Sequence, residues 1–203
     1  MSDGGDGGYR ALIGESAALV RVAHTALRGA TAVLTDPAGG EAGVPAAEKA
    51  LAELLTRIEE DAAGAPGGPA GVVAAVHVGC QVEALAGLAQ RLLEAAWARQ
   101  EREPFAEPLR APLHGLADAA LEAVARAADA LGSGAPEDAA DVLAHQQDVG
   151  ERQRLLYDLL LGPERTDPVD ATDLVLVSCC YQQCADRAAA VARHASQFSR
   201  PGA

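Results

Sequence analysis

The chain has 203 residues, of which 49% are hydrophobic but only 3% are aromatic, and its formal net charge is −13. So large a surplus of acidic groups argues against nucleic acid or an anionic membrane surface as a partner, because both are bound through clusters of lysine and arginine. Alanine and leucine supply most of the apolar content, which favours helices over sheets. No apolar run reaches the roughly 18 residues that a membrane span requires, and no signal peptide is visible, so we expect a cytoplasmic protein without direct membrane insertion.

The first half of the chain is predicted to form three helices. Residues 1–8 are polar and rich in glycine, and we expect them to be disordered. Apolar residues then recur at steps of three and four, separated by two stretches that contain glycine and proline. This pattern predicts helices at about 9–34, 46–63 and 70–100.

The second half is predicted to repeat this arrangement after a boundary at 103–112. That segment holds three prolines and reads as a linker between a first unit at 9–102 and a second unit at 113–200. The second unit is expected to contain helices at about 113–131, 136–161 and 168–200. No strand pattern occurs. We therefore predict an all-α fold of six long helices, packed as two tandem three-helix bundles.

The last predicted helix carries an apolar seam and a matching partner earlier in the chain. The seam steps by three and four along Leu174, Val177, Tyr181, Cys184, Ala188, Val191, Ala195 and Phe198. Gln182 and Asp186 lie one turn apart beside it. Residues 74–89 align with this helix without a gap, and the matched pairs are Val76 with Val175, Val78 with Val177, Cys80 with Cys179, Glu83 with Gln182, Ala86 with Ala185 and Ala89 with Ala188. The third helix of each half is therefore predicted to be a diverged internal duplicate.

Two three-helix units whose third helices repeat resemble the PhoU family of bacterial regulators. The second repeat of that family ends in a stretch of the form DLLLVARYLERIADHAVNIAE, and residues 173–193 read DLVLVSCCYQQCADRAAAVAR. Upstream, residues 132–160 resemble the turn and the helix that precede this stretch in the family. The resemblance covers nearly the whole chain and is more specific in the second half.

The resemblance implies a non-enzymatic regulator of phosphate uptake and of phosphate-responsive signalling. Its partners would be the ATP-binding subunit of the high-affinity phosphate importer and a membrane sensor histidine kinase. The family restrains both when phosphate is plentiful. Homodimers are common in the family, so a homodimer is also expected. The physical means would be docking of a helix face.

The family carries a Glu-x-x-x-Asp pattern on each third helix that can hold iron or zinc. By resemblance, the candidate metal ligands here are Glu83, Gln182 and Asp186, and the cofactor would be a divalent or ferric ion. Each pattern has lost one carboxylate, because Gly87 stands where Asp is expected and Gln182 stands where Glu is expected. Ionised oxygens supply most of the affinity for hard cations, so the sequence disfavours a multinuclear metal cluster.

Two other interpretations remain open. A metal-binding or redox-sensing helical protein would use Cys179, Cys180 and Cys184, of which the last two share a helix face, although packing of cysteine as a small hydrophobe is favoured. His77 and Cys80 are also one turn apart, but a metal site there needs ligands from another helix that the sequence does not identify. The remaining interpretation is a helical adaptor that has lost the phosphate role.

Overall fold

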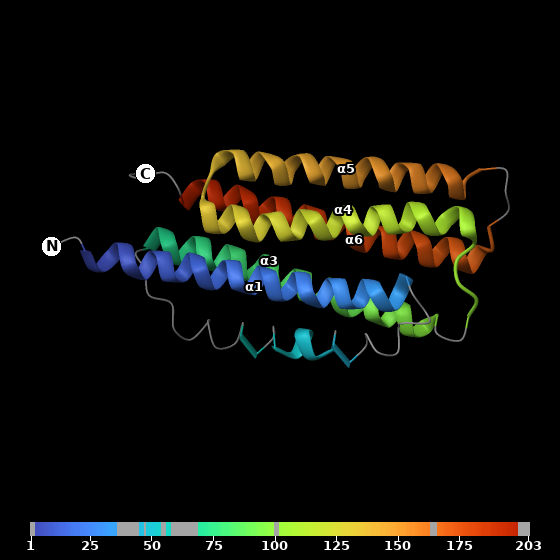
Figure 1. Cartoon of the computed structure of the whole chain (residues 1–203), viewed down its shortest axis with the longest axis horizontal. Helices are drawn as coiled ribbons and strands as arrows, with labels where there is room; N and C mark the ends of the chain where they lie inside the picture. The colour runs from blue at the N-terminus through green and yellow to red at the C-terminus, as the bar shows by residue number, and fades with distance from the viewer. Residues whose placement is uncertain are drawn as a thin grey trace.

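The computed structural model describes residues 3–35, 45–46, 48–53, 56–57, 69–99, 102–162 and 166–198. The predicted all-α class is confirmed, since the described ranges contain helices and no strand. The five long helices are α1 (Asp3–Thr35), α3 (Pro69–Ala98), α4 (Glu107–Ser133), α5 (Pro136–Leu160) and α6 (Pro168–Phe198), as shown in Figure 1. Within the predicted second helix at 46–63, the described residues 46, 48–53 and 56–57 are helical, and the others lie outside the described residues. Among the helices described, none combines the length and the apolar character needed to cross a membrane.

The helices lie side by side along one axis. Helices α1, α3 and α5 run in one direction, and α4 and α6 run in the other (Figure 1). Helix α1 packs against α3 and α4, and α6 also packs against α3 and α4, so these four helices form a closed ring. Helix α5 packs against α4 and α6 from outside the ring.

The core of the ring is made of small and branched aliphatic side chains. Val20, Leu85, Leu116 and Val124 are fully buried, and fully buried alanines on α1 and α4 let the helix axes approach closely. Every described side chain of the predicted α6 seam is buried, which confirms the three-and-four periodicity there. Long amphipathic helices draw most of their stability from such a buried face, so the seam fixes which side of α6 faces inward.

Two helix boundaries differ from the sequence prediction. Helix α1 begins at Asp3 rather than near Tyr9, because a helix that has already formed is extended at much lower cost than one that must be nucleated. Helix α4 begins at Glu107, inside the segment predicted as a linker. Pro108 lies in its first turn, where the missing N–H would have no helical partner, and only Pro112 lies inside the helix. Helix α4 ends at Gly134, whose φ of 64° is the left-handed conformation that glycine adopts readily.

Candidate functional site

A row of polar side chains lies between α5 and α6, and we call it the α5–α6 polar seam. It consists of Gln146, Gly150, Gln153 and Tyr157 on α5 and of Ser178, Cys179, Gln182 and Asp186 on α6. At one end, Gln146 Nε2 donates to Asp186 Oδ1 at 2.7 Å, and Gln182 Nε2 donates to the same oxygen at 3.2 Å. One carboxylate oxygen thus receives an amide donor from each helix.

The middle of the seam holds a buried acceptor without a partner. The Gln182 side-chain oxygen Oε1 is buried and accepts no hydrogen bond from any described residue. Gly150 lies opposite, and a Cβ added there would be 3.6 Å from this oxygen, which is ordinary van der Waals contact. Leaving a buried acceptor unpaired costs about 1–3 kcal/mol, which offsets part of the stabilisation that the hydrogen bonds of the seam give to the packing of α5 on α6.

The other end of the seam is a small hydrogen-bond network around Tyr157. Ser178 Oγ and Gln153 Nε2 each lie 3.1 Å from the Tyr157 hydroxyl oxygen, and Cys179 Sγ lies 3.5 Å from it. Burial, the largest cause, raises the pKa of Tyr157, so its hydroxyl stays protonated near neutral pH. These contacts are hydrogen bonds among hydroxyl, amide and thiol side chains. They order two helices and do not pair a nucleophile with a base.

Of the three predicted metal ligands, Gln182 and Asp186 are joined by a described contact. Gln182 and Asp186 are half-buried neighbours on α6, as their spacing predicted. Glu83 is exposed on α3, and no described contact joins it to either of them. Within the described ranges, no group of three His, Cys, Asp or Glu side chains is arranged to hold a metal ion. The Gln146 and Gln182 amides occupy an oxygen of Asp186 that a cation would otherwise need.

The change Gln182→Glu should make the stability of this protein depend on metal. We expect a loss of about 1 kcal/mol in EDTA, because a second carboxylate would face Asp186 in a half-buried position and raise the pKa of the pair. Zn²⁺ or Mn²⁺ should return the free energy of unfolding of this variant to its original value and leave that of the wild type unchanged. Urea unfolding with and without metal measures both. Gln90→Glu, beside the exposed Glu94 on α3, is the matched control and should respond weakly. A wild type stabilised by metal as strongly as the variant would contradict this account.

Two of the three cysteines of α6, Cys180 and Cys184, are poorly placed to react. Cys184 is fully buried and Cys180 is half-buried. Burial is the main cause that raises the pKa of both thiols, and the pKa of Cys184 lies far above its usual range. Because the thiolate is the nucleophile and the metal ligand, both side chains act mainly as small hydrophobes at neutral pH.

Burial of Cys184 and Tyr181 predicts a loss of stability in alkaline solution. Both groups have a folded pKa above the unfolded values of about 8.5 and 10, so the folded state holds their protons longer. Their contribution to stability is complete below about pH 8.5. It then declines by about 1.4 kcal/mol per pH unit through Cys184, and from about pH 10 by a similar amount through Tyr181. Urea unfolding between pH 7 and pH 10.5 should show this decline. Cys184→Ala should remove most of the part that begins near pH 8.5, with the rest due to the half-buried Cys180, and an unchanged profile would refute the assignment.

A partly buried charge cluster joins the end of α3 to the start of α6, and the sequence analysis missed it. Arg99 Nη1 lies 2.9 Å from Asp170 Oδ1 and 2.7 Å from Asp173 Oδ2, and Arg102 bonds to the same two carboxylates. Arg99 also stacks on Phe105, with its Cζ 3.6 Å from the ring centroid. The available signal was an arginine pair and an aspartate pair, each with a spacing of three. We call these five residues the Arg99 cluster.

The structure supplies a partner helix for His77. The His194 ring of α6 stacks on the His77 ring of α3, with centroids 4.8 Å apart and planes 9° from parallel. The lone pair of an imidazole nitrogen lies in the ring plane, so two stacked rings do not direct their lone pairs to one point. The pair therefore forms a packing contact between α3 and α6 and not a chelating site.

Comparison with known proteins finds no family model that matches the chain and no curated protein that is significantly similar to it. The polar seam and the Arg99 cluster therefore have to be interpreted from their own geometry.

Proposed function

We propose that the chain is a PhoU-like, non-enzymatic regulator of phosphate uptake and phosphate-responsive signalling, built as two tandem three-helix bundles. The main support for this proposal is the pattern of buried residues along α3 and α6. Residues that the sequence alignment pairs between the two helices are buried alike. Val78 and Val177 are both buried, as are Ala86 and Ala185. An ungapped match in both residue type and burial is what duplication of one helical unit produces.

The packing of the helices is compatible with a division into two units. Helices α4, α5 and α6 all pack against one another, as a three-helix bundle requires. Helices α3 and α6, the proposed third helices, pack side by side, and the Arg99 cluster ties their ends together. Asp173, the first residue of the family-like motif, belongs to that cluster. In this chain the motif therefore has a structural role at its start.

Exposed aliphatic side chains on α6 offer a surface for a protein partner. Val169, Val175 and Leu176 are 52%, 40% and 60% exposed. Val169 and Leu176 are seven residues apart, so they lie on one face of the helix. Docking of an importer ATP-binding subunit or a sensor histidine kinase needs such a face and no reactive group.

A native pull-down from cells grown with ample or scarce phosphate tests this function. The tagged chain should recover a phosphate-importer ATP-binding subunit or a sensor histidine kinase, more strongly when phosphate is ample, as identified by mass spectrometry. Val169→Ser combined with Leu176→Ser should reduce recovery at least about tenfold. Docking would bury both aliphatic side chains, and the loss of each costs about 1.5–3 kcal/mol of binding free energy.

Leu161→Ser is the control, because Leu161 is 85% exposed on the turn after α5 and lies outside the α6 face. This control should recover the same partners as the wild type. Recovery of neither partner class under either condition would leave a helical adaptor without the phosphate role.

A further inference from the structure

Helix α5 is held to the rest of the molecule much more weakly than the helix beside it. Of its 25 residues, only Ala139, Val142, Val149 and Leu156 are buried. Helix α4 has 27 residues and buries twelve of them. Burial of apolar area is the main source of stability, so the free energy that holds α5 in place is correspondingly small.

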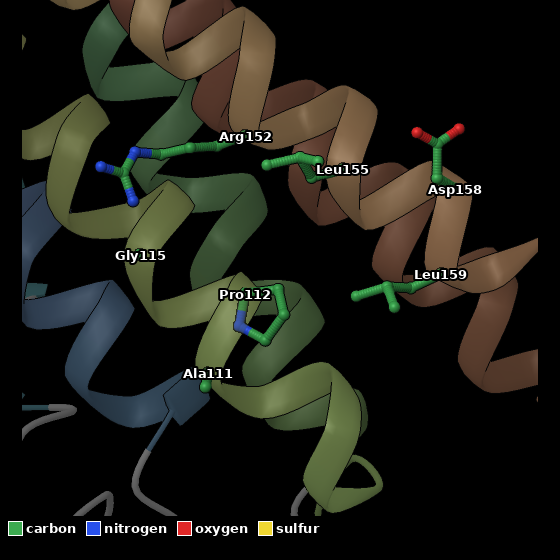
Figure 2. A pocket seen from close by; sticks show the side chains of 7 residues that line it. All are labelled: Ala111, Pro112, Gly115, Arg152, Leu155, Asp158 and Leu159. Atoms are coloured by element: carbon green, nitrogen blue, oxygen red, sulfur yellow. The ribbon is translucent and has the colours of Figure 1, made fainter.

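Helix α5 packs weakly against both of its neighbours, α6 and α4, for different reasons. On the α6 side lies the polar seam, where the unpaired Gln182 oxygen offsets part of what the hydrogen bonds of Gln146 and Tyr157 contribute. On the α4 side a groove of about 460 Å³ opens between the helices, lined by Ala111, Pro112, Gly115, Arg152, Leu155, Asp158 and Leu159. Figure 2 shows the Arg152 side chain reaching from α5 across to α4 near Gly115, with Leu155 and Leu159 beside the open space. Leu155 remains 62% exposed, so α4 does not cover it.

The N-terminal end of α5 is joined to α4 by a short turn. This turn passes through Gly134, whose positive φ is a conformation that glycine adopts readily, and Ser133 Oγ bonds to Ala135 N and to Asp138. An ion pair between Arg126 of α4 and Asp141 of α5 is exposed to solvent and adds little. The four-helix ring of α1, α3, α4 and α6 is closed without α5.

From these observations we infer that α5 is a displaceable cover, which undocks from α4 and α6 as a unit while the four-helix ring stays folded. The polar seam sets how often it opens. Undocking exposes the face between α4 and α6 to solvent, so α5 controls access to that face. This inference does not depend on the phosphate role proposed above.

Native-state hydrogen exchange on the full chain, followed by mass spectrometry of peptides, tests the inference. After correction for intrinsic rates, amides in the middle of α5 should exchange at least about 100-fold faster than amides in the middle of α1 and α4, because local opening requires less free energy than global unfolding. Equal protection in α5 and the ring helices would overturn the inference.

Two variants separate opening of α5 from general loosening. Leu156→Ala removes the largest fully buried side chain of α5 and should speed exchange of α5 about tenfold or more, with no change in α1 and α3. Replacing Gln146, Gln182 and Asp186 together by Leu should slow exchange of α5 about tenfold, because it removes the unpaired acceptor and a half-buried charge.

The matched control is Gln90→Leu with Glu94→Leu, since this amide and carboxylate form the same kind of bond, at 3.1 Å, on the exposed face of α3. It should leave exchange of α5 unchanged. If Leu156→Ala speeds exchange equally in every helix, α5 opens only with the whole molecule and the inference fails.

Discussion

Replacing Arg99 with alanine should lower the free energy of unfolding by about 3 kcal/mol, as measured by urea unfolding at pH 7. The Arg99 side chain is 8% exposed and bonds to Asp170, Asp173 and the backbone oxygen of Glu103. Its loss leaves two partly buried carboxylates with Arg102 as their remaining described cation. It also removes the cation–π contact with Phe105, which contributes about 1–2 kcal/mol where the pair is desolvated.

The matched control is Arg21→Ala. Arg21 also bonds to an aspartate on another helix, Asp129, at 3.3 Å, but both side chains are largely exposed. Solvent screening limits such a pair to less than about 1 kcal/mol, so this variant should unfold almost like the wild type. Equal effects of the two variants would show that the Arg99 cluster does not hold α3 to α6. Raised salt should weaken the Arg21 pair more than the Arg99 cluster.

Truncating Tyr181 to alanine should cost about 4 kcal/mol of unfolding free energy, because it leaves a large cavity in the closed ring of helices. Tyr181 is 1% exposed, and its hydroxyl donates to Thr31 Oγ1 at 3.0 Å, which links α6 to α1 across the core. Tyr181→Phe keeps the ring and removes only this hydrogen bond. It should lower the free energy of unfolding by about 1 kcal/mol, and by somewhat more because the buried Thr31 hydroxyl oxygen loses its donor.

Differential scanning calorimetry of Tyr181→Ala and Tyr181→Phe separates the effect of the cavity from the effect of the lost hydrogen bond. We expect Tyr181→Ala to lower Tm several times more than Tyr181→Phe does. The control is Leu159→Ala, since Leu159 is 44% exposed beside the groove and its truncation opens no enclosed cavity. A Tyr181→Ala variant as stable as Leu159→Ala would mean that Tyr181 is not part of a close-packed core.

Contacts along one helix were predictable and contacts between helices were not. The spacing of four between Gln182 and Asp186 placed them on one face, and they are indeed hydrogen-bonded. Nothing in the sequence indicated that Gln146 would donate to the same carboxylate, because that contact depends on how α5 slides along α6. Arg99 likewise lies in an ordinary polar segment at the end of its helix, and only the approach of α6 makes it a buried charge.

The sequence by itself determined the helical class, the positions of most helices and the inward face of α6. These properties follow from local propensity and from a period of 3.6 residues, which one segment expresses without reference to any other. The tertiary structure decided that α1, α3, α4 and α6 close into a ring, that α5 remains outside it, and that Gln146 of α5 bonds to Asp186 of α6. The reason is physical: the relative shift and rotation of packed helices depend on the sum of many small contacts, and no single stretch of sequence carries that sum.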